Sequence, residues 1–290
     1  MAEIYKSAAG KELVESRYRR ALQRWPVPHH QLIVPTKQGD TFVIVSGESH
    51  ATPLVLFHGS GTNSSVWMRD VAEWAQRYRV YAVDMIGEPG LSAASRPPLA
   101  SAAHAAWLDE VFDYLGLAAA SIVGVSLGGW LALDYAIRRP KRVASLTMVS
   151  PSGIDRQNHL SLIKAGVLLK FGSWGLRKSL KLIAGNVDVP REARDFLVTT
   201  FRHFRPRMDW IPIKTDDELA TLRMPVQLIL GGKDALLRSS ETRDRMQRLA
   251  PQLQLTYLEN DGHLVPRQTA TIAEFLKRCE RQPKGCVECC

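Results

Sequence analysis

The chain has 290 residues, of which 45% are hydrophobic and 23% charged, as in soluble globular proteins and unlike disordered or fibrous ones. This length allows one domain that carries an insertion. No apolar run approaches the roughly 18 to 20 residues of a membrane-spanning helix, and the N-terminal segment is too charged for a signal peptide. We therefore expect a soluble, cytoplasmic protein.

The formal net charge of +9 raises the question of a nucleic-acid or anionic-membrane partner. The basic residues do not gather in one segment, most have acidic residues nearby, and no nucleic-acid motif accompanies them. This pattern indicates a solvated basic surface and no nucleic-acid partner. The excess is shared among Arg17, Arg19, Arg20, Arg24, Arg177, Lys178, Lys181, Lys277, Arg278, Arg281 and Lys284.

The cysteines all lie near the C-terminus, so they cannot cross-link the body of the fold as a secreted disulfide framework would. Their position indicates a reducing compartment and a flexible tail over residues 281–290. A single C-x-x-C pair and scattered histidines lack the spacing of a metal site, so we expect no metal and no cofactor. The cysteines are Cys279, Cys286, Cys289 and Cys290.

The N-terminal part of the chain reads as a helical arm followed by a hairpin. Residues 1–30 are rich in helix formers and end at Pro26 and Pro28. Two short β-type runs follow at 31–35 and 41–47, separated by turn residues. They predict an antiparallel pair of strands.

Short, continuous apolar runs then predict strands that are buried on both faces of a parallel sheet. Amphipathic stretches with helical spacing separate most of them. This alternation predicts the α/β class: a mostly parallel central sheet flanked by helices, with its core over 31–151 and 223–280. The strands are expected at 53–59, 79–85, 120–126, 143–151, 225–232 and 254–260, and the helices at 66–78, 102–117 and 127–140.

Residues 152–222 break this rhythm, because no convincing strand occurs in them. We interpret the segment as a helical cap inserted into the α/β core. Any one of its apolar side chains could simply pack between helices. Together we expect them to cover a pocket, exclude water and select the substrate. They include Leu168, Leu169, Phe171, Trp174 and Phe201.

A G-x-S-x-G motif, Gly124-Val125-Ser126-Leu127-Gly128, joins a predicted strand to a predicted helix. A sharp strand-to-helix turn of this kind holds the serine in a strained conformation with its hydroxyl exposed. Only glycine-sized neighbours two residues to either side avoid a clash there. Ser126 is therefore the candidate nucleophile.

A serine hydroxyl needs a general base and a carboxylate that orients the base. His263 lies just beyond the last predicted strand, and Asp234 follows the strand before it, where catalytic groups of open α/β sheets collect. We therefore assign His263 as base and Asp234 as its orienting acid. Asp155, one strand earlier, is the alternative acid, whereas Asp261 is too close in sequence to orient His263 well.

These motifs resemble the α/β-hydrolase superfamily, and the chain looks most like its prokaryotic carboxylesterases. The resemblance rests on the HGSG loop at 58–61, VDMIGEPGLS, GVSLGG, LGGKD and DGH, and it covers most of the chain outside 152–222. It implies the α/β-hydrolase fold and an oxyanion hole made by the backbone N–H groups of Ser60 and Leu127. His58 is expected to be a structural turn residue, and Asp84 to bond local backbone.

The predicted function is hydrolysis of a small-molecule carboxylic ester through an acyl-enzyme. Lactone, thioester or C–C bond hydrolysis on the same fold stays open, although HGSGT departs from the HGSGPG form associated with the C–C hydrolases. A ligand receptor that lost turnover is a rival of another class. A membrane-surface protein that uses residues 162–185 is a second rival, and we expect no stable membrane association. The sequence indicates no oligomeric state.

Overall fold

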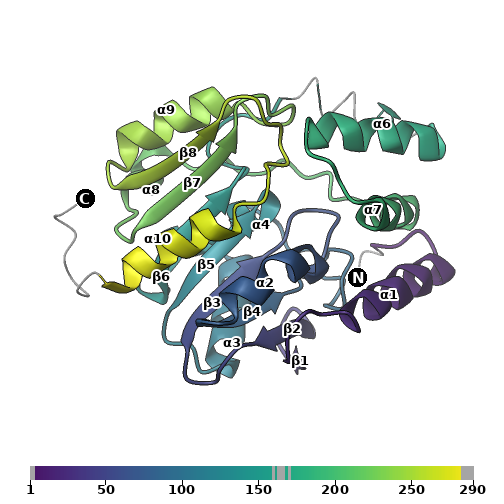
Figure 1. Cartoon of the computed structure of the whole chain (residues 1–290), viewed down its shortest axis with the longest axis horizontal. Coiled ribbons are helices and arrows are strands. Elements are labelled where there is room, and N and C mark those ends of the chain that lie inside the picture. The colour runs from purple at the N-terminus through teal and green to yellow at the C-terminus, as the bar shows by residue number, and fades with distance from the viewer. Residues whose placement is uncertain (1–3, 159–160, 162–166, 169–170, 282–290) are drawn as a thin grey trace.

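The centre of the fold is an eight-stranded sheet with the strand order β1-β2-β4-β3-β5-β6-β7-β8 (Figure 1). The computed structural model describes residues 4–158, 161, 167–168 and 171–281. The pairs β1–β2 and β2–β4 are antiparallel and the other pairs are parallel, which confirms the predicted hairpin and parallel strands. The strands are β1 His29–Val34, β2 Thr41–Ser46, β3 Thr52–Phe57, β4 Tyr78–Val83, β5 Ala120–Val125, β6 Val143–Val149, β7 Val226–Gly231 and β8 Leu253–Leu258.

Burial along the strands follows their place in the sheet. The inner strands β5, β6 and β7 are buried almost throughout, as their continuous apolar runs predict. The edge strand β1 is exposed or half-buried except at Val34, and β8 at the opposite edge is half-buried throughout. The strands that lead to Ser126 and Asp234, β5 and β7, therefore lie in the buried core of the sheet.

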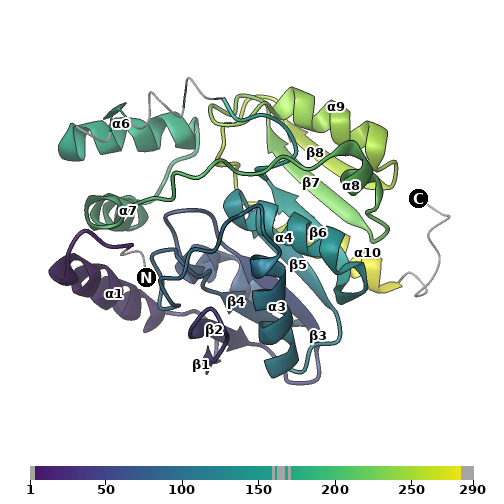
Figure 2. The same cartoon turned by 180° about the vertical axis from the view of Figure 1, so that it is seen from behind.

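Helices cover both faces of the sheet (Figures 1 and 2). The helices α3, α4 and α9 lie on one face, where Trp107, Trp130 and Met246 enter the larger apolar cluster. The helices α2 and α10 lie on the other face, where Trp74 and Ile272 belong to a second cluster. The helices are α1 Ala8–Leu22, α2 Val71–Trp74, α3 Ala103–Tyr114, α4 Leu127–Arg138, α6 Gly172–Ala184, α7 Arg191–His203, α8 Asp216–Ala220, α9 Ser239–Leu249 and α10 Thr269–Arg281, with 3-10 turns η1 Ser64–Arg69 and η2 Pro140–Arg142.

The helix predicted over 66–78 is wrong in its extent. The segment forms η1 and then the short helix α2, and it ends at Trp74. Its start is drawn forward because the backbone N–H and hydroxyl of Ser64 both donate to Asp84 Oδ1, at 2.9 and 2.7 Å. Its end comes early because Tyr78 already pairs with Thr52 in the sheet.

Between β6 and β7 the described residues form α6, α7 and α8, and they form no strand beyond two isolated bridges, from Gln157 to Leu237 and from Phe204 to Tyr5. Helix α7 runs beside α1 in both views. Arg17 of α1 donates to Thr199 of α7 at 2.6 Å. The N-terminal arm thus packs on the insertion. The domain boundaries predicted at residues 30, 152 and 222 stay predictions. Two parts of the sequence prediction lie outside the described residues: Leu169 of the insertion, and the tail beyond Arg281.

Candidate active site

Ser126 occupies a sharp turn between β5 and α4. Its backbone has φ 53° and ψ −112°, a strained conformation for a side chain other than glycine. A Cβ on Gly124 would lie 2.3 Å from the Gly128 carbonyl oxygen, and one on Gly128 would lie 2.3 Å from that of Phe57. The glycines are therefore required by close backbone approach. Ser126 N–H donates to Val149 O at 2.9 Å, which fixes the turn to β6.

His263 joins Ser126 to Asp234. The distance from His263 Nε2 to Ser126 Oγ is 3.0 Å, and from Nδ1 to Asp234 Oδ2 it is 2.7 Å. A carboxylate can only accept, so Nδ1–H donates to Asp234, and Nε2 is left to accept the Ser126 hydroxyl proton. His263 is 5% exposed and the Asp234 side chain is fully buried, so water competes little for either bond. The structure thus brings the three residues into one hydrogen-bonded chain.

Asp234 is itself held by backbone donors. Its Oδ1 accepts the N–H groups of Leu236 and Leu237 at 2.7 and 3.0 Å. The turn after β7 is tied to the histidine loop, because Lys233 N–H donates to Asp261 O at 2.8 Å. The carboxylate therefore has one oxygen bound to its own turn and the other aimed at His263.

The alternative acid Asp155 makes no hydrogen bond to His263 among the described residues. Its Oδ1 accepts the backbone N–H of its neighbour Arg156 at 2.6 Å, and His263 Nδ1 is already bonded to Asp234. The structure accordingly places Asp234, rather than Asp155, beside the imidazole.

The loop at 58–61 approaches Ser126 from β3. A Cβ on Gly59 would lie 3.6 Å from Ser126 Cβ, so the loop passes directly beside the serine. Neither the Ser60 nor the Leu127 backbone N–H donates to another protein group in the part of the chain that the structure describes. Leu127 begins α4, whose N-terminus carries a partial positive charge. Two unpaired donors therefore lie next to the serine.

His58 ties this loop to the end of β4. Its Nε2 accepts the Met85 N–H at 2.9 Å, so its Nδ1–H donates to Gly59 O at 2.9 Å. Burial lowers the pKa of His58, which keeps the ring in this neutral form. Asp84 accepts from the backbone N–H groups of Ser64 and Leu91, which confirms its predicted backbone role, and also from Tyr18 Oη.

Sequence reasoning missed Glu88, which lies under the 58–61 loop and is 2% exposed. Its Oε2 accepts the Gly61 N–H at 2.6 Å and the Ser60 hydroxyl at 3.3 Å. Burial raises its pKa to about 7, against the lowering effect of the Gly61 N–H and of nearby arginines. The only sequence signal was a glutamate in the VDMIGEPGLS loop, directly after a buried strand.

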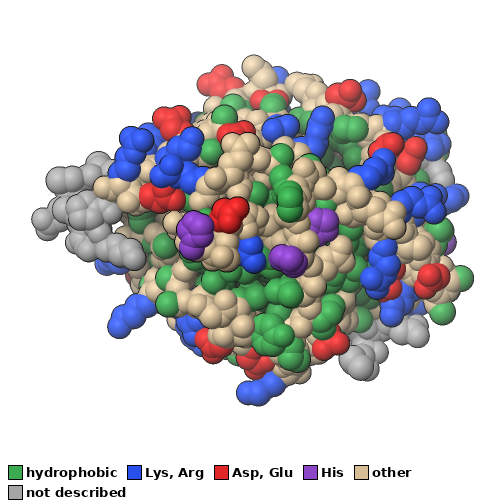
Figure 3. Space-filling model, turned by 60° about the horizontal axis from the view of Figure 1, so that its bottom comes forward, with side chains coloured by type: hydrophobic (Ala, Val, Ile, Leu, Met, Phe, Trp, Pro, Cys, Tyr) green, Lys and Arg blue, Asp and Glu red, His purple; other side chains and the backbone are tan. Residues whose placement is uncertain are grey.

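Other candidate chemistry is limited. Among the described residues, no group of three or more His, Cys, Asp or Glu side chains could hold a metal ion. Within the same residues, no helix is both long and apolar enough to cross a membrane. On the face in Figure 3, Lys and Arg side chains are spread out with Asp and Glu among them.

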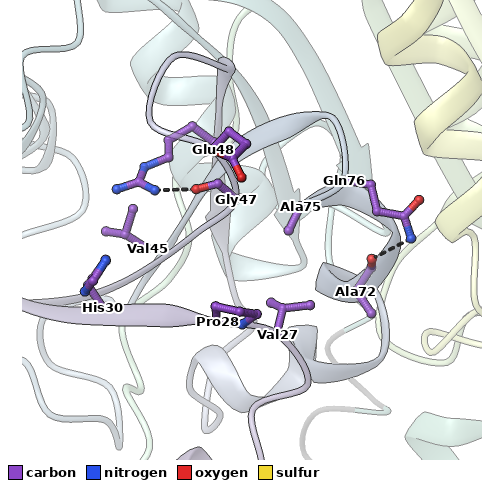
Figure 4. Close-up of a pocket in the computed structure, with 10 residues that line it drawn as sticks. Val27, Pro28, His30, Val45, Gly47, Glu48, Ala72, Ala75 and Gln76 are labelled. Carbon is purple, nitrogen blue, oxygen red and sulfur yellow. Dashed lines mark hydrogen bonds between the residues drawn. The ribbon is translucent and has the colours of Figure 1, made fainter.

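A hollow of about 240 Å³ lies between the β1–β2 hairpin and α2 (Figure 4). In it the Arg79 guanidinium donates to Gly47 O, and Gln76 donates to Ala72 O at 3.1 Å. No residue that lines it belongs to the Ser126–His263–Asp234 chain or to the 58–61 loop, so we assign it no chemistry. Its lining is Val27, Pro28, His30, Val45, Gly47, Glu48, Ala72, Ala75, Gln76 and Arg79.

Comparison with known proteins gives a consistent set of relatives. Residues 54–275 match the profile of the alpha/beta hydrolase family. The chain is 32% identical over 256 residues to carboxylesterase YbfK of Bacillus subtilis, which covers 86% of each chain. Its fold is similar to that of a Bacillus subtilis naproxen esterase, with a TM-score of 0.80, 29% identity, and 97% and 99% of the two chains covered. A putative hydrolase from the same organism superposes with a TM-score of 0.85 and 27% identity, over 94% and 99% of the chains.

Proposed function

Because this chain belongs to the alpha/beta hydrolase family, we propose that it is a serine hydrolase that cleaves small carboxylic esters through an acyl-enzyme. The single observation that carries the proposal is the hydrogen-bonded chain from Ser126 through His263 to Asp234. The names of the relatives, carboxylesterase and naproxen esterase, support an ester as substrate.

In the acylation half-reaction, Ser126 Oγ attacks the ester carbonyl carbon while His263 Nε2 takes the hydroxyl proton. Asp234 holds the imidazole in the required tautomer and stabilises the imidazolium that forms. The tetrahedral intermediate then collapses: the carbon–oxygen bond to the alcohol breaks, and the alcohol leaves with the proton from His263. Ser126 is left as an acyl ester.

In the deacylation half-reaction, water takes the place of the alcohol. His263 accepts a proton from the water as its oxygen attacks the acyl carbon, and it returns that proton to Ser126 Oγ when the second intermediate collapses. The carboxylic acid is released and the serine is regenerated. No group outside the chain is needed to balance either half.

The negative charge on the carbonyl oxygen needs donors placed before the reaction begins. We assign the N–H groups of Ser60 and Leu127 to this role, because both lie beside Ser126 and neither is bonded within the described protein. Removal of one such donor in comparable hydrolases costs about 3 to 4 kcal/mol of transition-state stabilisation. The dipole of α4 adds to the effect at Leu127.

We further propose that residues 152–222 act as a cap over this site. Ile183 of α6 accepts the N–H of Leu264, the residue after His263, at 3.3 Å. The Phe201 ring of α7 would lie 2.4 Å from a Cβ placed on Gly61. The insertion therefore touches both the histidine loop and the 58–61 loop, where it could exclude water and select the acyl group.

The remaining expectations about partners are also proposals. We infer no nucleic-acid partner and no stable membrane association, since acidic side chains are interspersed among the basic ones on the face in Figure 3. We also infer a cytoplasmic location, because the cysteines gather at one end of the chain rather than in its body.

Hydrolysis of p-nitrophenyl acetate, butyrate and octanoate tests the proposed function. We expect the wild-type protein to hydrolyse at least one ester, and Ser126→Ala to reduce kcat by about 10⁴-fold or more at unchanged fold. Ser16→Ala, at an exposed serine of α1, is the matched control and should leave kcat unchanged. An inactive wild type towards all three esters, or an active Ser126→Ala, would contradict the proposal.

A further inference from the structure

The carboxyl group of Glu88 lies under the turn that carries Ser60. It is buried, yet it makes no contact that the proposed proton transfers use. Its Oε2 accepts the backbone N–H of Gly61 and the hydroxyl of Ser60, at 2.6 and 3.3 Å. Of the two, the shorter bond goes to the peptide unit that directly follows Ser60.

We propose that Glu88 is a positioning residue, which holds the Ser60–Gly61 turn so that the Ser60 N–H is directed at the developing oxyanion. This inference rests on the proposed function, because it gives Glu88 a role only if Ser60 N–H is an oxyanion donor. A donor that is preorganised needs no rearrangement when charge develops, so holding it in place lowers the barrier to reaction.

The turn needs such an anchor because its conformation is unusual. Gly61 has φ +70°, in the left-handed region that other residues rarely adopt. The Phe201 ring occupies the space that a Gly61 side chain would need. The turn is thus held by the Glu88 carboxyl group and packed against the cap.

Glu88 is in turn placed by its own loop and by residues after α7. The Arg96 guanidinium donates to Gly87 O at 3.0 Å and to Arg205 O at 2.7 Å, and it lies over the Phe204 ring. The Arg207 side chain is only 7% exposed and donates to Pro97 O at 3.0 Å. The loop that carries Glu88 is therefore fixed to the segment that follows the cap helices.

The hydrogen bond from the Gly61 N–H to Glu88 does not depend on the protonation state of the Glu88 carboxyl group. Burial favours the neutral acid, whereas Arg96 and Arg207 favour the carboxylate. Both forms keep an oxygen that can accept the Gly61 N–H. A neutral isostere with the same reach should consequently replace Glu88 in this role.

Three substitutions separate placement from charge. Glu88→Gln keeps an acceptor at the same reach, Glu88→Asp keeps the charge but withdraws the acceptor by one methylene, and Glu88→Ala removes it. We expect kcat to fall about tenfold to a hundredfold in the Ala and Asp variants with little change in KM, since the oxyanion contact strengthens only in the transition state. The Gln variant should keep kcat within about threefold of wild type.

Binding of a trifluoromethyl ketone supplies a readout that a purely structural role would not move. This inhibitor forms a tetrahedral oxyanion on the active serine, so its Ki should rise in the Ala and Asp variants by the same factor as kcat falls. Asp209→Asn is the matched control, because Asp209 pairs with Arg207 but is mostly exposed. It should leave kcat and Ki unchanged.

The outcomes distinguish the two proposals. If wild type hydrolyses esters and Glu88→Ala, folded by circular dichroism, keeps its kcat and Ki, the role of Glu88 is wrong while the proposed function stands. A Gln variant as impaired as the Ala variant would also overturn it, because charge rather than placement would then matter. If wild type neither hydrolyses esters nor binds the ketone, the proposed function fails first and Glu88 has no such role.

Discussion

The two oxygens of Asp234 have different partners, and this difference makes a sharp prediction for Asp234→Asn. Oδ1 accepts two backbone N–H groups, so the amide oxygen of the variant must take that position and its NH₂ group must face His263. Nδ1 then has to accept, the ring proton moves to Nε2, and the imidazole can no longer take the proton of Ser126. We expect kcat to fall by about 10⁴-fold at unchanged fold, as the wrong tautomer does in other serine hydrolases.

The measurement is steady-state hydrolysis of the best p-nitrophenyl ester, with Asp261→Asn as the control. Asp261 lies two residues from His263 and bonds Leu258 and Lys233 through its backbone, which the variant keeps, so its variant should retain wild-type kcat. A near-wild-type Asp234→Asn, or an Asp155→Asn variant with the larger loss, would contradict the assignment of Asp234.

The residues of the site differ in how far the sequence could predict them. Ser126 and His263 could be predicted because the G-x-S-x-G motif marks the strand-to-helix turn in the sequence itself, and because one histidine follows the last strand. The choice between Asp234 and Asp155 stayed open, since both follow buried strands. Glu88 was missed because its burial and its hydrogen bonds come from segments far apart in the chain.

Among the structural elements, α4 carries the nucleophile turn at one end and a buried ion pair near the other. Asp134 of α4 accepts from Lys214, and both side chains are at most 5% exposed. Arg138 donates to both Asp134 oxygens, at 2.9 and 3.1 Å. Through these contacts the segment that returns from the insertion is fastened to the helix behind Ser126.

Removing one member of this pair should destabilise the protein strongly. Asp134→Ala leaves the Lys214 ammonium buried with only Glu218, 3.7 Å away, to compensate it. We expect the free energy of unfolding to fall by about 3 kcal/mol, the lower end of the range for a broken buried pair. Urea denaturation measures the change. The double variant Asp134→Leu, Lys214→Met should recover most of the loss, and a double variant as unstable as the single one would contradict this account.

Local sequence patterns predict the helices and strands better than they predict the contacts between them. Continuous apolar runs predicted the parallel strands, and amphipathic stretches with helical spacing predicted the helices between them. The helix predicted at 66–78 started too late, because Ser64 bonds Asp84, and it ended too late, because Tyr78 pairs with β3. The contact of α1 with α7 could not be predicted, since Arg17 and Thr199 lie far apart in the sequence.

For the whole molecule, two buried titratable groups give opposite pH dependences of stability. The folded-state pKa of Glu88 is raised to about 7, so its contribution is fully present below about pH 4.5 and is lost as pH rises through 7. The pKa of His104 is lowered to about 4 by burial, so its contribution is present above about pH 6.5 and is lost as pH falls towards 4. The two effects largely cancel in the wild-type protein between these limits.

The Glu88→Gln variant separates the contribution of Glu88 from that of His104, because the variant has no carboxyl group to titrate at position 88. Relative to this variant, wild type should lose on the order of 3 kcal/mol of unfolding free energy as pH rises from 4.5 to 7, because only wild type must then ionise a buried carboxyl group. Urea denaturation at pH 4.5, 5.5 and 7 measures the difference. A difference that stays constant over this range would show that Glu88 titrates at its ordinary value in the folded protein.

A fluorophosphonate reacts only with an activated serine, so intact mass after treatment with this reagent measures the activation of Ser126. We expect one adduct per chain, mapped by peptide analysis to Ser126, formed in wild type and in Ser16→Ala and absent in Ser126→Ala. Its rate should fall sharply in Asp234→Asn, because the same imidazole must take the serine proton. No adduct in the folded wild-type protein, or an adduct that persists in Ser126→Ala, would contradict the account.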